Sequence, residues 1–252
     1  MSNSTLSNKK HQQKYAQAIY QAKEAGNSSF HNWFNKAQDV EQATIRGYWD
    51  FSSHILTPKV CEYIEQPEQK TALEIGFGGG RLLNAACSFF KEAIGIDIHN
   101  EQETVEAFLR KQGKHNFKLI QTPGDSIGVE TESIDFVYSF IVLQHLPSFD
   151  TFRNYIVETY RCLKPGGVAQ LYFGKFSKIK WQALHPRYFI QGYKEIPDAP
   201  VNYTSLVIRV SKVKKICFAT GFQVIESGHS FKRVPDGYPR IKGGQNYVTL
   251  LK

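Results

Sequence analysis

From residue 71 onward, short apolar segments alternate with segments of helical periodicity, and this alternation constrains the fold more than any other feature of the chain. Helical stripes such as Val105, Phe108 and Leu109 separate several of the apolar runs. Alternating strand and helix favour a parallel sheet with helices on both faces. The apolar runs of strand length lie at 71–75, 93–98, 117–120, 134–141 and 168–173.

The last third of the chain departs from this rhythm. Helical periodicity from Leu206 to Cys217, ended by Gly221, precedes two apolar runs near 222–228 and 246–251. No helix fits between these two runs, so we expect them to pair antiparallel as a hairpin. The sequence therefore predicts an α/β fold: a seven-stranded, mostly parallel sheet with an antiparallel last strand, flanked by helices.

Two appendages accompany this region. Residues 1–66 read as a helical extension, with Thr57 as an N-cap and Pro58 at the first helical position. Residues 174–203, rich in aromatics and without a clear period, form an insert after the fifth strand, and such irregular inserts are usually functional. We expect the extension to act as a lid, the insert to act as a substrate lid, and residues 67–252 to form the main domain.

Helix starts are also marked. Asn100 followed by Glu103 predicts a capping box for the helix that carries Val105. Ser148 or Asp150 opens a later helix, which ends before the turn at 164–167.

Cysteine usage and charge limit the setting in which the chain works. The four cysteines show neither CxxC pairs nor zinc spacing, so we expect no disulfide framework and no metal site, and a cytoplasmic location. Residues 1–13 lack the apolar core of a signal peptide, and no stretch reaches 18 apolar residues, so no membrane span is expected. Residues 164–252 hold 15 basic and 4 acidic residues. This excess favours an anionic partner or substrate, or simply a soluble basic surface.

A glycine-rich segment follows the first predicted strand. It reads LEIGFGGGR over residues 73–81 and sits between a strand and a helix, where bare backbone can approach a ligand or simply make a tight turn. A dinucleotide loop would read GxGxxG, but Arg81 stands where the last glycine belongs. Glu74 would repel a pyrophosphate and favour a ligand that carries an amino group.

Two further acids lie at the ends of strands. Asp97 ends the second strand, 21 residues after Gly76, where a carboxylate can accept both hydroxyls of a ribose or simply stabilise a helix N-terminus. Asp125 follows the third strand and can accept from the exocyclic amine of adenine, or form an Asx turn after Pro123-Gly124. Together these residues predict an adenosine-containing ligand.

The chain at this point resembles the class I S-adenosylmethionine-dependent methyltransferases, which have a Rossmann-like sheet. The match spans about residues 71–173, with the motifs in the family's order and spacing. They are EIGFGGG at 74–80, GID at 95–97, GD at 124–125, the segment 134–147 ending in VLQHLP, and LKPGG at 163–167.

This resemblance implies S-adenosyl-L-methionine as cofactor, S-adenosyl-L-homocysteine as product, and roles for individual residues. Gly76, Phe77 and Gly78 form the loop beside the methionine part, and Glu74 orders this loop and reaches the amino group through water. The other expected contacts are Asp97 to the ribose, Ile98 against the adenine, Asp125 and Ser126 at the adenine edge, and the backbone of Phe140 and Ile141 to the amine. The extension at 1–66 would then be a cofactor lid.

Methyl transfer mainly requires alignment of acceptor, methyl and sulfur, with a general base where the acceptor must lose a proton. His145, just past the fourth strand, is the candidate base, although a structural histidine bonded to backbone explains it as well. Aromatic and histidine side chains of the two appendages could contact the acceptor or merely pack on the sheet. These candidates are Tyr48, Trp49, Trp181, His185 and Tyr188.

Several functions remain open from the sequence. A small-molecule methyltransferase, with an aromatic or anionic acceptor, fits best. An RNA or protein methyltransferase is favoured by the basic C-terminal third, although no separate nucleic-acid module is visible. A nicotinamide-dependent oxidoreductase is disfavoured by Glu74 and Arg81, and a non-catalytic sensor of an adenosine ligand is compatible with the fold. The sequence is silent on oligomeric state.

Overall fold

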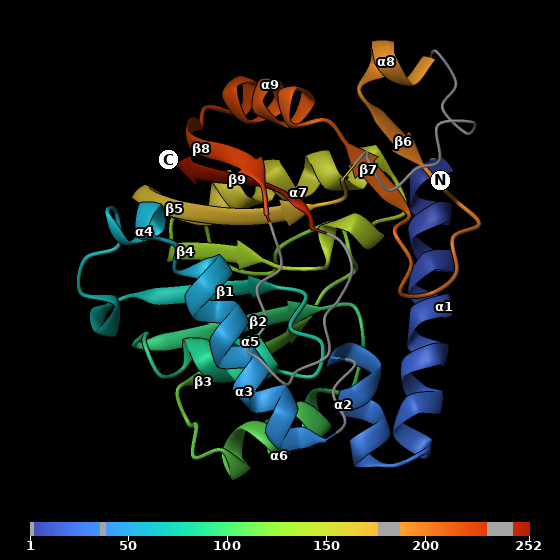
Figure 1. The fold of residues 1–252 in the computed structure, drawn as a ribbon, viewed down its shortest axis with the longest axis vertical. Helices are drawn as coiled ribbons and strands as arrows, with labels where there is room; N and C mark the ends of the chain where they lie inside the picture. The colour runs from blue at the N-terminus through green and yellow to red at the C-terminus, as the bar shows by residue number, and fades with distance from the viewer. Residues whose placement is uncertain (1–2, 36–38, 176–186, 231–243) are drawn as a thin grey trace.

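The computed structural model describes residues 3–35, 39–175, 187–230 and 244–252 and has a seven-stranded sheet at its centre (Figure 1). Its strand order is β3-β2-β1-β4-β5-β9-β8. The strands are β1 (Thr71–Ile75), β2 (Glu92–Asp97), β3 (Phe117–Gln121), β4 (Ile134–Ser139), β5 (Leu163–Phe173), β8 (Gln223–His229) and β9 (Asn246–Leu251).

Strand directions confirm the predicted fold. The first five strands pair parallel, whereas β9 pairs antiparallel with both β5 and β8. Chain order reverses at β1, because β2 and β3 lie on one side of it and β4 and β5 on the other. In open α/β sheets the carboxyl ends of the strands at such a reversal form the ligand crevice.

Helices cover both faces of the sheet, as Figure 1 shows. Alternate residues of β4 pack into two separate cores: Phe136 and Tyr138 join α5 and α6, while Val137 joins α7 and α9. The helices are α1 (Asn3–Glu24), α2 (Asn27–Asn35), α3 (Val40–Asp50), α4 (Pro58–Cys61), α5 (Arg81–Ala86), α6 (Gln102–Lys111), α7 (Phe149–Cys162), α8 (Arg187–Gln191) and α9 (Val210–Thr220), with a π-helical turn at Phe51–Ile55.

Most helix ends follow the predicted signals. The Thr57 and Ser148 hydroxyls accept from the backbone N–H of Val60 (3.2 Å) and Thr151 (3.1 Å), and Gly221 ends α9 with φ +111°. The capping box at Asn100 and Glu103 is wrong. The helix α6 starts one residue later than that box requires, since the Glu101 N–H donates to His99 Nδ1 (3.1 Å).

The helix expected from Leu206 begins later, at Val210. Leu206–Ile208 instead form β7, which pairs antiparallel with β6 (Tyr193–Glu195) in a separate two-stranded sheet. All three side chains of β7 are fully buried. A short run of apolar residues fits a buried strand as well as a helix, and here it forms the strand. The insert at 174–203 therefore contains α8 and β6 within the part that the structure describes.

The helices α1 and α2 lie at one end of the sheet. Figure 1 shows α1 running beside the carboxyl ends of the parallel strands, with α2 next to it. None of the described helices combines the length and apolar character that crossing a membrane requires.

Candidate functional site

A cavity with about 1110 Å³ of space free of atoms, counted to its open mouth, lies where chain order reverses in the sheet. Residues after β1, β2, β3 and β4 form its floor, and α1 and α2 cover it. The side chains from these two helices are His11, Gln12, Tyr15, Ile19, Trp33 and Phe34.

The glycine turn after β1 forms one wall. Gly76 (φ +81°) and Gly78 (φ +51°) adopt the left-handed conformation that favours glycine. A Cβ on Gly78 would lie 2.8 Å from Phe34 Cδ1, and one on Gly76 would lie 2.4 Å from a Val142 methyl. The turn therefore needs glycine at both positions, and it presents bare backbone to the cavity.

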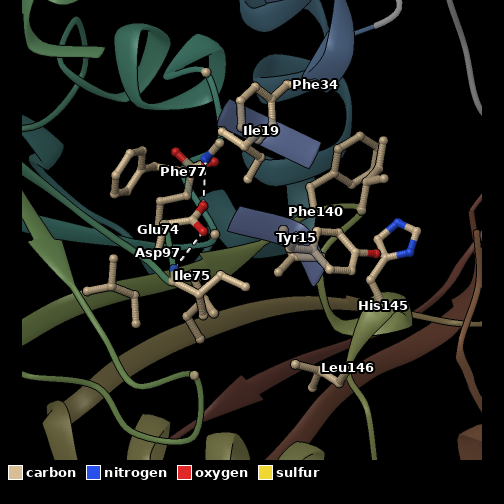
Figure 2. Close-up of a pocket in the computed structure, with 18 of the residues that line it drawn as sticks. Tyr15, Ile19, Phe34, Glu74, Ile75, Phe77, Asp97, Phe140, His145 and Leu146 are labelled. Carbon is tan, nitrogen blue, oxygen red and sulfur yellow. Dashed lines mark hydrogen bonds between the residues drawn. The ribbon is translucent and has the colours of Figure 1, made fainter. Parts of the chain in front are cut away.

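Asp97 lies beside this turn at the end of β2. Its Oδ2 accepts from the Gly78 N–H (2.8 Å) and its Oδ1 from the Ile98 N–H (2.7 Å), as Figure 2 shows. A carboxylate offers about four lone-pair sites, so both oxygens can still accept from a ligand. The side chain is 13% exposed and lines the cavity, which suits it to a pair of ligand hydroxyls.

Glu74 lines the same end of the cavity and is 2% exposed. The Tyr138 hydroxyl donates to its Oε2 (3.2 Å). Burial raises the pKa of Glu74 to about 8, although the Arg81 charge and the Tyr138 bond oppose this rise. A cationic group of a ligand placed beside Glu74 would favour its ionised form.

A buried ion-pair cluster stands behind the glycine turn. Arg81 Nη1 donates to Asp50 Oδ2 (2.7 Å), and Arg46 Nε lies 3.7 Å from the same oxygen. Burial, and then the Arg81 charge, lower the pKa of Arg46 to about 10. The cluster ties α3 to the start of α5 and thereby fixes the turn. Arg46 serves this structural contact rather than the cavity lining.

His145 lies at the opposite end of the cavity from Glu74 and Asp97, across from the Tyr15 ring (Figure 2). Its Nδ1 donates to the Tyr203 carbonyl (2.7 Å), and the Gln144 amide donates to its Nε2 (3.1 Å). The Tyr203 bond fixes the tautomer, so Nε2 is the basic nitrogen.

The remaining polar groups at this end are neutral. Burial, and then the His145 charge, lower the pKa of His11 to about 4, and burial raises that of Tyr15 to about 12. The Tyr15 hydroxyl accepts from the Asn202 N–H (3.3 Å) in the loop between β6 and β7. Within the described lining, the acidic side chains are Glu74 and Asp97, both at the glycine-turn end.

The backbone just past β4 is strained. Ile141 has φ +65°, a conformation that costs a β-branched residue on the order of 1–3 kcal/mol. Phe140 and Ile141 both line the cavity at this point. Strain of this kind clusters at ligand sites, where the surrounding structure holds the backbone in a required orientation.

The structure brings most of the predicted residues to this cavity. Those that line it are Glu74, Gly76, Phe77, Gly78, Asp97, Ile98, Phe140, Ile141 and His145. Asp125 and Ser126 are not part of the lining; Pro123 and Gly124 of the same loop are.

The predicted acceptor residues are placed differently. Tyr48 and Trp49 lie on α3, outside the cavity lining, which corrects the expectation that they face it. The Tyr48 hydroxyl instead contacts Ser88 Oγ (2.8 Å), and Trp49 is 39% exposed. Trp181 and His185 lie outside the described residues, and of Tyr188 only the backbone, in α8, is described.

The sequence predicts a lid over residues 1–66 but identifies none of the lining residues of its first two helices. His11, Tyr15 and Ile19 recur every four residues, so they share one helix face, and this spacing was a usable signal. Trp33 and Phe34 of α2 and Asn202 of the β6–β7 loop also line the cavity, but no local pattern marks them. Across the described ranges, no group of three or more His, Cys, Asp or Glu residues is arranged to hold a metal ion.

Comparison with known proteins finds similarity to methyltransferases. Residues 73–171 match the family described as "Methyltransferase domain". The chain is 30% identical over 149 residues to a sterol 24-C-methyltransferase of Clavispora lusitaniae, which covers 58% of this chain and 36% of that protein. It is 29% identical over 130 residues to a ubiquinone biosynthesis O-methyltransferase of Hydrogenovibrio crunogenus, which covers 48% of this chain and 52% of that protein.

The chain thus spans about a third to a half of the length of these two relatives. Among solved structures, a SAM-dependent methyltransferase from Methanosarcina mazei superposes with a TM-score of 0.57 at 20% identity, covering 78% of this chain and 97% of that chain. The shared fold is the Rossmann-like methyltransferase sheet with its antiparallel last strand.

Proposed function

We propose that this chain, which carries a class I S-adenosylmethionine-dependent methyltransferase domain, transfers the methyl group of S-adenosyl-L-methionine to a small-molecule acceptor. The observation that carries the proposal is the division of one cavity into two ends. One end holds the glycine turn with Asp97 and Glu74, and the other holds a histidine base among aromatic walls.

The residues at the first end fit the cofactor. Asp97 offers its carboxylate to the two ribose hydroxyls, and Ile98 offers an apolar surface to the adenine. The Glu74 carboxylate compensates the positive charge of the cofactor's amino group. Gly76 and Gly78 carry no side chain, so the methionine part can lie close to the turn. The same residues disfavour a dinucleotide, because a buried acid faces the turn where a pyrophosphate would sit.

The bound cofactor supplies an electrophilic methyl group on a sulfonium. The chain then has to align the acceptor with that methyl and exclude water, and positioning of this kind can contribute about 7–11 kcal/mol. Tyr15, Trp33 and Phe34 cover the cavity from the N-terminal helices and would exclude water. This supports the assignment of residues 1–66 as a cofactor lid.

His145 is the proposed general base. Its Nδ1 is held by the Tyr203 carbonyl, so Nε2 can receive the proton of an acceptor hydroxyl that displaces the Gln144 amide. General-base assistance contributes typically ~10²–10⁴-fold, and it matters where the acceptor must lose a proton.

The acceptor end suits an apolar or aromatic small molecule. Its walls include Trp33, Leu146 and Pro147, and its polar groups are two imidazoles, a phenol and Asn202. The two relatives carry names that refer to sterols and to ubiquinone biosynthesis, both built on apolar carbon skeletons. We assign residues 174–203 as the substrate lid, since the Asn202 and Tyr203 contacts close this end.

Calorimetry with S-adenosylmethionine, S-adenosylhomocysteine and NADH tests the proposal. We expect micromolar binding of the two sulfur ligands, no binding of NADH, and loss of binding in Asp97→Ala. Asp150→Ala, an exposed acid at the start of α7, is the matched control and should bind normally. Tight NADH binding without binding of the sulfur ligands would reject the proposal.

A further inference from the structure

The side chain of Gln12, on α1, contacts a loop that lies 111 residues away along the chain. Its Nε2 donates to the Pro123 carbonyl in the loop after β3. The side chain lines the cavity together with Ile98, Pro123 and Gly124. These are the residues next to Asp97 on the side where, under the proposed function, the base of an adenosine ligand would continue from the ribose.

Gly124 shows how closely these groups approach. A Cβ on Gly124 would lie 3.0 Å from Gln12 Nε2 and 3.0 Å from Ile98 Cγ2. The carboxamide and the isoleucine therefore flank one bare stretch of backbone. An apolar side chain and a carboxamide in this arrangement can contact the face and the edge of a planar base.

The orientation of the carboxamide follows from its bond. Because Nε2 donates to the Pro123 carbonyl, turning the amide over would bring Oε1 against another carbonyl oxygen. Gln12 thus presents a fixed acceptor, Oε1, and a second N–H on Nε2. A carboxamide with one donor and one acceptor matches the amino group and adjacent ring nitrogen of adenine.

Contacts along the length of α1 set its position. Lys23 Nζ lies 2.6 Å from Glu101 Oε2 at the start of α6, and Lys14 Nζ donates to the Ala199 carbonyl (2.6 Å). The Asn202 N–H donates to Tyr15. Gln12 is therefore held in place by three contacts that do not involve its own side chain.

The geometry points to Gln12 as a binding residue that recognises the adenine of the cofactor, with Oε1 accepting from its exocyclic amine. This inference rests on the proposed function and deepens it. The N-terminal helix then belongs to the cofactor site itself, and the predicted contacts from Asp125 and Ser126 are not needed for recognition of the adenine edge.

The test compares two ligands by calorimetry: S-adenosylhomocysteine and S-inosylhomocysteine, in which an acceptor oxygen replaces the amine. The wild-type protein should bind the adenine ligand about tenfold to hundredfold more tightly. Gln12→Leu should lose most of that preference, by weakening S-adenosylhomocysteine while leaving S-inosylhomocysteine nearly unchanged. Gln13→Leu is the matched control, because Gln13 is exposed and outside the lining.

Gln12→Glu provides a second variant of the same shape, which keeps an acceptor but loses the donor. It should weaken S-adenosylhomocysteine and lose the anchor to Pro123. If Gln12 only tied α1 to the β3 loop, both substitutions would weaken the two ligands by the same factor, and that result would overturn the inference. Equal wild-type affinity for both ligands would overturn it as well. Binding of neither ligand to the wild-type protein would instead reject the proposed function.

Discussion

At the scale of single residues, Glu74 serves two opposed requirements. It is buried beside the glycine turn, where the ionised form loses hydration, yet the proposed ligand needs a negative charge there. Burial raises its pKa to about 8, so the folded protein holds a proton that the unfolded chain releases near pH 4.5. Between these values the unfolded state binds fewer protons, and the free energy of unfolding falls as pH rises.

Glu74→Gln should therefore stabilise the protein at alkaline pH. Gln cannot ionise, and its side-chain oxygen can still accept from the Tyr138 hydroxyl. We expect a gain of roughly 2–5 kcal/mol at pH 8.5 and little gain at pH 4.5, from urea unfolding at both pH values. The same variant should bind S-adenosylhomocysteine more weakly. Glu130→Gln, on the surface, is the control, and equal gains at both pH values would contradict the argument.

His145→Asn isolates the basic nitrogen. Asn can keep the donation to the Tyr203 carbonyl while it removes the base at Nε2. For an acceptor that must lose a proton, kcat should fall by ~10²–10⁴-fold, with the affinity for S-adenosylhomocysteine unchanged. His115→Asn, on an exposed loop, should have no effect. A loss of the same size for an acceptor that has no proton to release would argue against the role as base.

The sequence could reveal residues whose roles depend on local order. Glu74 and Asp97 are fixed by their positions at strand ends, and both line the cavity. Tyr48 could not be assigned to a face in the same way, because the direction of α3 depends on a buried ion pair between Asp50 and Arg81. The role of Gln12 could not be predicted from the sequence, because its hydrogen-bond partner, Pro123, lies 111 residues away along the chain.

At the scale of elements, α1 is unusual in how little apolar surface holds it. Among its side chains that the structure describes, Ile19 is the one that is buried and apolar. The Tyr15 ring, which is partly buried, also packs against the core, and further anchors are polar contacts such as Lys23 to Glu101 and Lys14 to Ala199. Elements with few buried apolar contacts open locally at low free energy.

Ligand binding should therefore protect α1 more than any central strand. We expect fast amide hydrogen exchange over residues 9–24 in the free protein and at least tenfold slower exchange with saturating S-adenosylhomocysteine, since a ligand stabilises the state that binds it. Hydrogen exchange followed by mass spectrometry measures this, with β4 as the internal reference. Equally slow exchange of α1 with and without ligand would show that the helix is already part of a rigid core.

Periodicity predicts whether a segment is a helix or a strand in two cases: where one face of the segment is buried, and where a fully buried run has the length of a typical strand. The strand β4 and the helix α7 were predictable for this reason. The sequence wrongly predicts a helix for the run Leu206–Ile208, because three buried residues fit either period and its pairing partner β6 lies in an insert without a pattern of its own.

At the scale of the whole molecule, the cavity is a seam between the sheet and the N-terminal helices. The loops after the parallel strands line one side of the cavity, as the spacing of the motifs predicts. The helices α1 and α2 cover the other side, and their position depends on contacts between segments distant in sequence. A ligand in this seam contacts both layers, so its binding free energy stabilises the docked arrangement of the two rather than the sheet alone.

Thermal unfolding should report this linkage directly. S-adenosylhomocysteine at 100 times its Kd adds about 2.7 kcal/mol to the free energy of unfolding. For a chain of 252 residues, this corresponds to a rise in Tm of roughly 5–11 °C. Differential scanning calorimetry with increasing ligand measures the rise, and NADH should give none.

Variants locate the origin of that shift. Asp97→Ala should abolish it at the same ligand concentration, because this variant removes the proposed contact to the ribose, whereas Asp150→Ala should keep it in full. A two-step transition in which only the first step moves with ligand would mean that the N-terminal helices unfold before the sheet. A Tm that stays constant up to millimolar S-adenosylhomocysteine would contradict a cofactor site in this seam, since any ligand that binds the folded state alone must raise it.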